Sequence, residues 1–380
     1  MMHRRAFFAS TLALALAGAT GIPAAASDDG PISVVATFSV LGDMVARIGG
    51  ANVSVTTLVA ADGDAHVYRP TPADARAVKG ADLLVFNGLG FEGWLERLID
   101  ASDFSGERLI ATRGIEPIGF DEDDDDDHDD HAGEEGHAEH AKDEHAKDEH
   151  AKDEHAKDEH ANEEHANEEH GHDASADAGG DDHDDHADKD EEAHADADHH
   201  GHHHGAIDPH AWQSLGNAVV YAENIAAALS RMAPEHTATF EANRDAYIAE
   251  IRALDGEIRA LFAGLPEGRR TIVTSHDAFQ YFARSYDLTF LSPQGLSTES
   301  EASAKDVASL IRQIRAEGIT AVFVENIADT RLLKQIAAET GAQIGGTLYP
   351  DALSGPDGPA STYLDMIRHN AQTLVKALAV

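Results

Sequence analysis

Cysteine is absent from the 380 residues of this chain, and its absence removes several possibilities at once. Without a thiol the chain has no disulfide, no zinc site with thiolate ligands and no catalytic cysteine. There is also no amino-terminal cysteine to which a lipid anchor could be attached. Any metal chemistry of this protein must therefore use imidazole, carboxylate and backbone groups.

Basic residues are also scarce, because 28 lysines and arginines face 70 aspartates and glutamates, which gives a formal net charge of −42. An acidic chain without basic clusters is a poor partner for nucleic acid or for an anionic membrane surface. After residue 26 no stretch is long and apolar enough to span a bilayer. We therefore expect neither nucleic-acid binding nor membrane insertion.

The first 26 residues have the pattern of a secretory signal peptide. Basic residues at 3–5 precede an apolar run at 6–19, and the sequence Pro-Ala-Ala-Ala-Ser at 23–27 supplies a cleavage site of the A-x-A type. The apolar run falls short of the ~20 residues that the alternative, a membrane-spanning anchor, would need. Arg4-Arg5 with Phe7-Phe8 also fits a weak twin-arginine signal, so the export route stays open. We expect a mature chain that lies in the periplasm and has no lipid anchor.

Residues 121–205, here called the His-rich tract, differ in composition from the rest of the chain. They hold 19 of the 25 histidines, 36 of the 70 acidic residues, five lysines and no large apolar residue. The tract therefore has a net charge of −31, and the remaining 34 acidic and 23 basic residues give −11. Such a segment can bind cations but cannot build a hydrophobic core, and charge runs of this kind are usually disordered.

Histidines recur through the tract, and from His140 to His170 they fall at every fifth residue. Five residues turn a helix through ~500°, so successive imidazoles lie about 140° apart and no helical face collects them. The spacing favours a flexible zinc ligand over a rigid site, and a solvated acidic spacer is the alternative. The accessory low-affinity metal ligands predicted here are His128, His131, His137, His140, His145, His150, His155, His160, His165, His170, His172, His183, His186, His194, His199, His200, His202, His203 and His204.

Outside the leader and the tract, short apolar runs alternate with helical patterns. The runs at 32–38, 53–59, 83–86 and 109–110 predict buried strands, and the same rhythm resumes after residue 270. Between these two segments, apolar residues recur at three- and four-residue steps from Phe240 to Phe262, which predicts one long helix starting at Pro234. We therefore expect an α/β fold with two lobes bridged by one long rigid helix and a ligand cleft between the lobes.

These patterns divide the chain into four parts. A signal peptide occupies 1–26, an amino-terminal α/β lobe that contains the tract as a disordered insertion occupies 27–233, a linker helix occupies 234–264, and a carboxy-terminal α/β lobe occupies 265–380.

Four residues lie where open α/β sheets place ligand-binding groups. His66 and His276 follow predicted strands and precede predicted helices, His210 lies just before a helix in Asp208-Pro-His, and Asp351 follows the final strand. Each residue alone is weak evidence, since a lone loop histidine is more often a surface residue. Together, three imidazoles and one carboxylate suit tetrahedral Zn²⁺.

Several neighbouring residues are candidates for orienting these ligands. Asp208 and Asp277 adjoin the second and third histidines, and Glu299 and Glu325-Asn326 lie in strand-end loops of the second lobe. Ordinary helix capping or surface charge is an equal alternative for each. The two remaining histidines, His236 and His369, are interpreted as structural or solvent-facing.

Four motifs resemble those of the metal-binding solute-binding proteins of ABC importers, in the ZnuA-like family (cluster A-I), and AztC-type members are the most similar. The motifs are Gly63-Asp-Ala-His-Val-Tyr-Arg-Pro-Thr-Pro72, Asp208-Pro-His-Ala-Trp212, Thr274-Ser-His-Asp-Ala-Phe279 and Tyr349-Pro-Asp-Ala-Leu-Ser354. The resemblance covers nearly the whole mature chain in the right order, including a His/Asp-rich insertion before the second histidine.

The resemblance implies two (β/α)4-type lobes bridged by one long helix, with Zn²⁺ between them on His66, His210, His276 and Asp351. Manganese members have a glutamate at the third position, and a nitrogen there favours Zn²⁺ over the harder Mn²⁺. One departure is that ZnuA-like proteins often have a glutamate beside the first histidine, whereas this chain has Ala65 there. Asp351 is therefore the better fourth ligand.

The implied function is high-affinity zinc uptake by a non-enzymatic periplasmic protein. Its expected partners are an ABC permease with its ATPase and a periplasmic zinc metallochaperone, and we expect a monomer. A closed set of four ligands and the lack of a His-Glu-x-x-His motif argue against a zinc hydrolase. A manganese-binding member of the same family, or a zinc buffer without a transporter, are the alternatives.

Overall fold

Two parallel four-stranded sheets organise the computed structural model, which describes residues 30–119, 207–266 and 268–379. The first sheet has the order β2-β1-β3-β4, and its strands are β1 (Ile32–Phe38), β2 (Val53–Val59), β3 (Leu83–Phe86) and β4 (Glu107–Ile110). The second sheet repeats this order as β6-β5-β7-β8, with β5 (Thr271–Val273), β6 (Thr289–Leu291), β7 (Ala321–Glu325) and β8 (Gln343–Leu348). In each sheet every pairing is parallel, so the carboxyl ends of all its strands share one edge.

Each strand is followed by a helix, which gives two (β/α)4 lobes. The helices of the amino-terminal lobe are α1 (Ser39–Gly49), α2 (Pro72–Lys79), α3 (Leu95–Ser102) and α4 (Leu215–Met232). Those of the carboxy-terminal lobe are α6 (Gln280–Tyr286), α7 (Ala304–Glu317), α8 (Thr330–Thr340) and α9 (Tyr363–Leu378). The hydroxyls of Thr71, Ser214, Ser303 and Thr362 accept backbone hydrogen bonds at the starts of α2, α4, α7 and α9. The expected α/β class with two lobes and a long bridging helix is confirmed.

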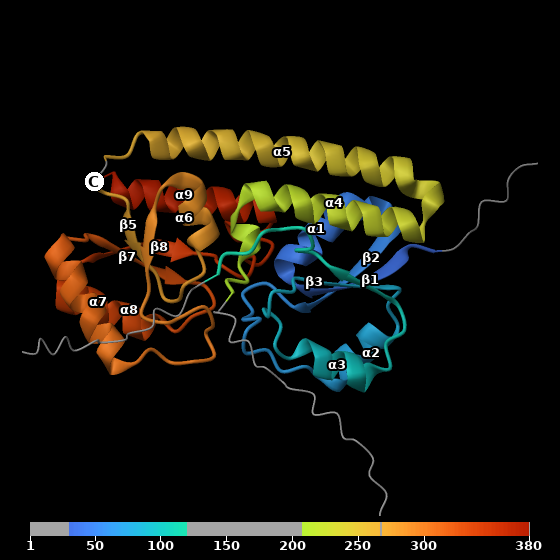
Figure 1. Ribbon diagram of the computed structural model, residues 1–380, viewed down its shortest axis with the longest axis horizontal. Helices are drawn as coiled ribbons and strands as arrows, with labels where there is room; N and C mark the ends of the chain where they lie inside the picture. The colour runs from blue at the N-terminus through green and yellow to red at the C-terminus, as the bar shows by residue number, and fades with distance from the viewer. Residues whose placement is uncertain (1–29, 120–206, 267, 380) are drawn as a thin grey trace, which may run out of the picture. The chain divides into compact units, whose positions relative to one another are not determined.

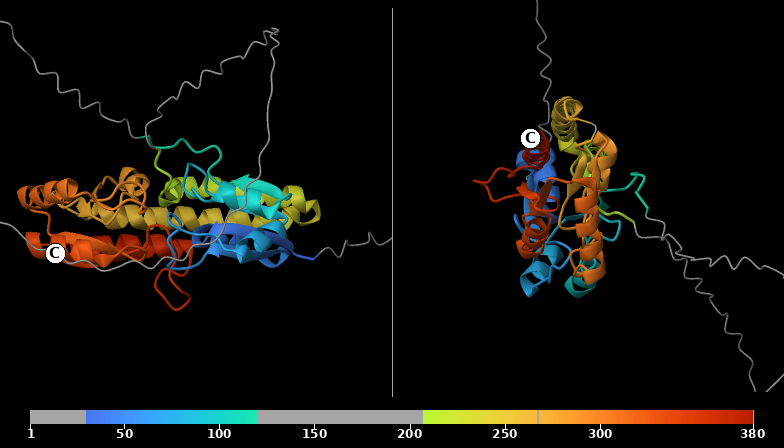
Figure 2. Two further views of the ribbon diagram at one scale, coloured as in Figure 1. Left: turned by 90° about the horizontal axis from the view of Figure 1, so that it is seen from below. Right: turned by 90° about the vertical axis from the view of Figure 1, so that its left-hand side faces the viewer.

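The bridging helix, here called the spine helix, is α5 (Thr237–Ala263), whose 27 residues span about 40 Å. Its buried residues repeat at helical spacing from Phe240 to Phe262 and face α1, α4 and α9. The blue-green lobe lies at one end of α5 and the orange-red lobe at the other (Figures 1 and 2). The helix begins three residues after the expected Pro234, because Pro234–His236 form a 3-10 turn that leads into it.

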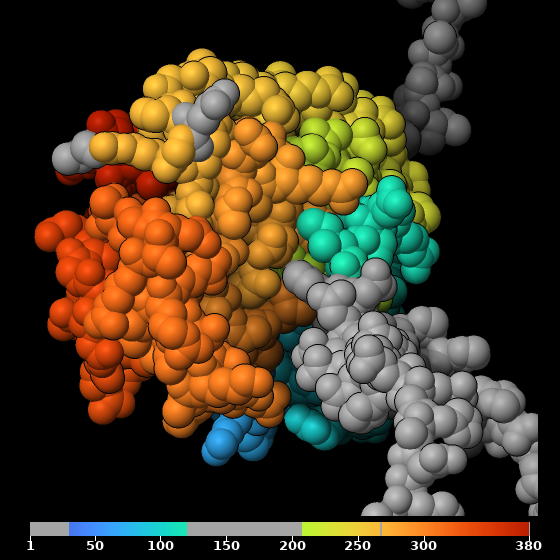
Figure 3. Space-filling model, turned by 60° about the vertical axis from the view of Figure 1, so that its left-hand side comes forward, coloured from blue at the N-terminus to red at the C-terminus, as the bar shows by residue number. Residues whose placement is uncertain are grey.

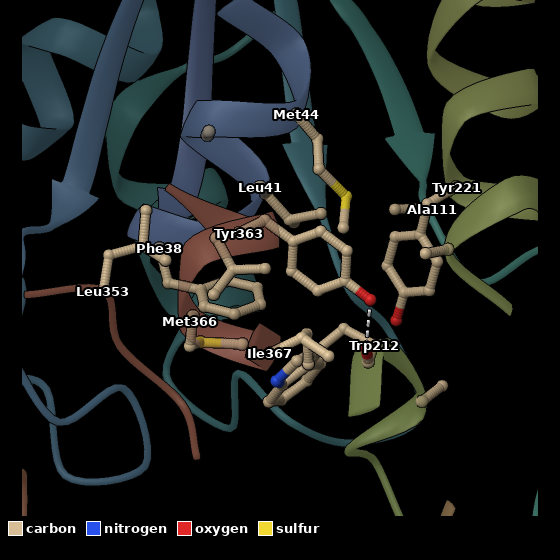
Figure 4. Packing of buried hydrophobic residues seen from close by; sticks show 14 of the residues in the cluster. Phe38, Leu41, Met44, Ala111, Trp212, Tyr221, Leu353, Tyr363, Met366 and Ile367 are labelled. Carbon is tan, nitrogen blue, oxygen red and sulfur yellow. Dashed lines mark hydrogen bonds between the residues drawn. The ribbon is translucent and has the colours of Figure 1, made fainter. Parts of the chain in front are cut away.

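One hydrophobic core runs from the amino-terminal sheet through α5 into the carboxy-terminal lobe, and a smaller core lies where α7 and α8 cover the second sheet. Where the lobes meet, Phe38, Trp212 and Tyr363 pack together, and the Tyr363 hydroxyl donates to the Trp212 carbonyl oxygen at 2.6 Å (Figure 4). This packing ties the start of α9 to the amino-terminal lobe. The lobes are therefore joined by buried apolar contacts as well as by the chain.

The predicted signal peptide and the His-rich tract with its nineteen histidines lie outside the described residues. Gly119 and Ile207, the described residues on either side of 120–206, form an isolated antiparallel bridge. The chain therefore leaves and re-enters the amino-terminal lobe at one place. The described residues belong to one compact unit. Among them, no helix combines the length and the apolar character needed to cross a membrane.

Candidate metal centre

His66, His210, His276 and Asp351 converge on one point between the two lobes. His66 lies in the loop between β2 and α2, here called the His66 loop (60–71), and His210 immediately precedes the 3-10 helix Ala211–Gln213. His276 and Asp351 each stand three residues beyond the ends of β5 and β8. One potential ligand atom from each residue lies within 4.8 Å of all the others. The parallel sheets thus explain how residues up to 285 positions apart meet, because both carboxyl edges face this point.

Three of the distances between the facing atoms are close to the edge length of a tetrahedral metal site. His66 Nε2 lies 3.4 Å from His210 Nε2 and 3.3 Å from Asp351 Oδ2, and His276 Nε2 lies 3.1 Å from the same oxygen. Ligands about 2.0–2.1 Å from a tetrahedral zinc ion are about 3.3–3.4 Å apart. Three nitrogens and one carboxylate at these distances therefore form a donor set suited to a divalent cation.

Burial makes the same cluster costly without a cation. His210, His276 and Asp351 are fully buried, and the His66 side chain is 4% exposed. Neither oxygen of Asp351 nor Nε2 of His276 has a hydrogen-bond partner among the described residues. Buried polar atoms without hydrogen bonds are unfavourable, whereas coordination of a cation would satisfy all of these atoms. The chemistry of the donor set therefore fits a divalent metal site.

Electrostatic interactions within the cluster favour a negative Asp351 and a positive charge beside it. Burial raises the pKa of the Asp351 carboxyl, but the imidazoles of His276 and His210 outweigh burial and hold that pKa well below its usual range. Burial lowers the pKa of His276, yet the carboxylates of Glu325 and Asp351 raise it well above its usual value. The electrostatics of the cluster thus favour a positive charge beside Asp351, at the place that a cation would take.

Two carboxylates outside the cluster fix the imidazole rings. The Nδ1 atom of His210 lies 2.7 Å from Asp208 Oδ1, and that of His276 lies 2.6 Å from Glu325 Oε2. Because an ionised carboxylate only accepts, each Nδ1 carries the proton and each Nε2 directs its lone pair at the cluster. Glu325 Oε1 also accepts the backbone N–H groups of Ser275 and His276. Both rings are therefore oriented before any metal binds.

The sequence did not distinguish among the candidate orienting residues. Asp208 has the anticipated contact, whereas Asp277 accepts a hydrogen bond from Gln280 Nε2 at 2.6 Å at the start of α6 and has none to His276 among the described residues. Glu325 takes that place from the end of β7, 49 residues along the chain. Glu299 is exposed and outside the cluster, and Asn326 bonds to Asp62 instead. Only the register of β7 beside β5 reveals Glu325 as the partner of His276.

Aromatic rings, which the sequence analysis did not single out, enclose one side of the cluster. The Phe91 ring packs edge-on against His66 with centroids 4.8 Å apart, and the Trp212 ring lies 5.3 Å from that of His210. Phe91 and Trp212 also contact each other, at 4.7 Å. These rings keep water from the imidazoles and restrict their rotation. His236 and His369 lie elsewhere, and His369 Nε2 contacts the Thr347 carbonyl oxygen at 3.1 Å.

The segment that carries His210 is held by both lobes. Asn87 Nδ2 of the amino-terminal lobe donates to the Pro209 carbonyl oxygen, and the Tyr281 hydroxyl of the carboxy-terminal lobe donates to that of Asp208. Trp212 Nε1 donates at 2.8 Å to the Pro350 carbonyl oxygen, directly before Asp351. His210 and Asp351 are therefore connected by a short and buried path.

Known proteins that are similar to this chain have names that refer to metals. A family model described as "Zinc-uptake complex component A periplasmic" (ZnuA) matches residues 34–377. The iron-binding protein YfeA of Yersinia pestis is 27% identical over 343 residues, which are 90% of this chain and 85% of that protein. In fold, the chain is similar to the Mn-bound periplasmic metal binding protein from Candidatus Liberibacter asiaticus, with a TM-score of 0.65, 28% identity and coverage of 91% of this chain and 99% of that one.

The periplasmic zinc binding protein TroA from Treponema pallidum has a TM-score of 0.68, with 92% of this chain and 99% of that one covered. At 23% identity this likeness concerns the fold alone. The three proteins are named for iron, manganese and zinc, so similarity alone leaves open which divalent metal the present site prefers.

Proposed function

Because the chain belongs to the family of zinc-uptake complex component A, periplasmic, we propose that it captures Zn²⁺ and delivers it to an inner-membrane ABC permease driven by a cytoplasmic ATPase. As a member of this family it is an extracytoplasmic metal-binding component of an ABC uptake system, and it is not an enzyme. Zinc as the cargo and the specific likeness to AztC-type members are parts of this proposal.

The choice of zinc is supported chiefly by the third histidine. His276 offers a nitrogen whose direction is fixed by Glu325, where a carboxylate ligand would suit the harder Mn²⁺. The rest of the donor set is consistent with this choice, because three nitrogens and one carboxylate suit a tetrahedral Zn²⁺ site. A manganese-binding member of the family is the alternative.

The proposal assigns His66, His210, His276 and Asp351 as the ligands and the His-rich tract as an accessory that captures zinc. The bridge between Gly119 and Ile207 supports this accessory role. It fixes Ile207, which follows the tract, three residues before His210. Imidazoles attached there would raise the local zinc concentration near the site. A periplasmic metallochaperone as zinc donor, a monomeric state, and domain limits at residues 26, 233 and 264 are further parts of the proposal.

The number of tight sites tests this function. We expect a variant without residues 121–205 to bind one zinc ion tightly per chain in isothermal titration calorimetry, since the four ligands lie outside the deletion. Adding His210→Ala to that variant should remove the tight site. His236→Ala is the matched control, because His236 lies at the start of the spine helix and away from the cluster, and it should leave binding unchanged.

Loss of all tight binding on deletion of the tract would contradict the proposal. It would favour the alternative in which the protein is a zinc buffer whose main store is the tract itself. Equal affinity of the deletion variant for Zn²⁺ and Mn²⁺ in competition titrations would contradict the choice of metal alone.

A further inference from the structure

The His66 loop is bonded to three consecutive strand-end loops of the opposite lobe. The Asp62 backbone N–H donates to the Leu353 carbonyl oxygen at 2.8 Å, and Asn326 Nδ2 donates to Asp62 Oδ1 at 3.0 Å. Thr298 Oγ1 donates to Asp64 Oδ2 at 2.6 Å. These partners follow β8, β7 and β6, so one short loop of the amino-terminal lobe touches the carboxyl edge of the second sheet across its width.

Asp64 connects this interlobe contact to a proposed metal ligand. While its Oδ2 atom accepts from Thr298, its Oδ1 atom accepts the backbone N–H of His66 at 2.9 Å. The same carboxylate therefore spans the lobe boundary on one side and shapes the turn before His66 on the other. His66 is also the only cluster residue that is not fully buried, and neither carboxylate orienting the other two imidazoles contacts it.

The contacts on the two sides of the cluster differ in kind. Toward the spine helix the lobes share the apolar core around Trp212 and Tyr363, which water cannot easily enter (Figure 4). Toward the His66 loop the lobes meet through polar side chains, and the Asn326–Asp62 bond is exposed to solvent. In Figure 3 a small patch of blue surface from the amino-terminal lobe is visible below the orange surface of the carboxy-terminal lobe. Solvent can replace these polar bonds far more readily than it can separate the apolar core.

A cavity of about 550 Å³ adjoins this polar side. Asp64 and Thr298 line it together with Glu301, Ile327 and Asp329 of the carboxy-terminal lobe. The Thr298–Asp64 bond therefore lies between the cavity and the His66 turn. If it opens, water from the cavity reaches the part of the site that is least enclosed by protein.

We propose that Asp64 and Thr298 form a latch that holds His66 against the opposite lobe and thereby slows release of the bound metal. Asp64 is a positioning residue, because it acts through the His66 backbone and supplies no ligand atom to the cluster. The latch rests on the proposed zinc-binding function, but it concerns the lifetime of the complex rather than the identity of the ligands. Opening the Thr298–Asp64 bond loosens the turn before His66 and leaves the other three ligands in place.

The latch predicts a specific change in zinc kinetics of the full chain. The protein is loaded with one equivalent of zinc and mixed with excess chelator, and the slow phase of release is assigned to the cluster by its absence in His210→Ala. Thr298→Val keeps the size of the side chain but removes the donor, so we expect the slow phase to accelerate about tenfold, the factor that corresponds to about 1.4 kcal/mol. Asp64→Ala should accelerate it further, because the His66 N–H also loses its acceptor.

Two variants separate the latch from a general structural effect. Thr298→Ser retains the hydroxyl and should keep the wild-type rate within about twofold. Thr289→Val makes the same exchange at an exposed position of β6, away from the lobe boundary, and should also leave the rate unchanged. If the wild-type protein shows the slow phase and Thr298→Val releases zinc at the same rate, the latch is wrong and the proposed function is unaffected. A wild-type chain with no slow phase dependent on His210 would overturn both.

Discussion

His276 lies between two carboxylates that have different tasks. Asp351 faces its Nε2 atom at 3.1 Å inside the cluster, and Glu325 faces its Nδ1 atom at 2.6 Å from outside. Both carboxylates raise the pKa of the imidazole, although burial opposes them. At the scale of the residue, any exchange of the third ligand therefore has to include Glu325, because a carboxylate in place of His276 would face the carboxylate of Glu325.

This pairing leads to a prediction about metal preference. We expect the double variant His276→Glu with Glu325→Gln to shift preference from Zn²⁺ toward Mn²⁺ by at least about tenfold, or ~1.4 kcal/mol. A glutamate supplies the harder oxygen ligand, and the glutamine still accepts the two backbone N–H groups while its amide donates to the new carboxylate. Competition titrations with both metals measure the ratio of the two dissociation constants.

Glu325→Gln alone is the control for this pair. It weakens the orientation of His276 and should reduce affinity for both metals by about tenfold or more, with little change in their ratio. If the double variant keeps the wild-type ratio as well, the third ligand does not set the metal preference.

Helix α2 illustrates how local sequence supports the site at the scale of an element. Thr71 and Asp74 form a capping box, in which the Thr71 hydroxyl accepts from the first turn and Asp74 Oδ2 accepts the Thr71 backbone N–H at 2.6 Å. The Tyr68 hydroxyl, two residues from His66, donates to the same oxygen. The capping box therefore fixes both the start of α2 and the end of the His66 loop.

The box predicts a stability difference that depends on pH. Burial raises the pKa of Asp74, but hydrogen bonds from Thr71 and Tyr68 outweigh it and leave the pKa below its ordinary value. The stabilisation is therefore present above the unfolded-state pKa of about 3.9 and is lost as the pH falls through the folded-state pKa. We expect Asp74→Asn to lower the free energy of unfolding by about 1 kcal/mol at pH 7 and by much less at pH 3.

Urea denaturation of the metal-free protein at both pH values provides the measurement. Asp357→Asn, at an exposed loop position whose carboxylate makes no hydrogen bond to the described residues, serves as the matched control and should be neutral. A cost of Asp74→Asn that is the same at both pH values would rule out the charged cap as its origin.

At the scale of the whole molecule, the arrangement combines a shared apolar core on the spine side with polar contacts at the His66 loop. The site belongs to both lobes, since His66 and His210 come from the first and His276 and Asp351 from the second. Release of a metal therefore requires the lobes, or the loop between them, to separate. Capture of a metal requires a way to bring the ion to the ligands, because the buried ligands have little direct contact with solvent.

The His-rich tract is proposed to meet that need, and its role predicts a rate. When free zinc is scarce, we expect a chain without residues 121–205 to load its tight site several-fold more slowly than the full chain, because the attached imidazoles raise the local metal concentration. Loading is followed in stopped flow against a zinc buffer. Replacing the nineteen histidines of the tract with glutamine keeps length and charge and should be as slow as the deletion.

Loading by the glutamine variant at the full-chain rate would show that acidic charge alone is sufficient. Equal rates for the full chain and the deletion would show that the tract acts only as a spacer.

Local sequence was enough to predict many individual elements. The alternation of apolar runs predicted both α/β lobes, and the periodicity from Phe240 to Phe262 predicted the spine helix; Thr71 and Pro72 occupy the N-cap and first positions of α2. These features follow from hydrophobic periodicity and from hydrogen bonds within four residues, so the linear order contains them. The four strand-end residues were also visible, because parallel sheets gather ligands at their carboxyl edges.

The sequence by itself thus determined the class of fold, the two lobes and the candidate ligands His66, His210, His276 and Asp351. Only the tertiary structure decided that Glu325 rather than Asp277 orients His276, and that Asp64 reaches Thr298 across the lobe boundary. The physical reason is distance along the chain. Contacts between residues 49 and 234 positions apart depend on strand order, register and lobe placement, which no local pattern of residues encodes.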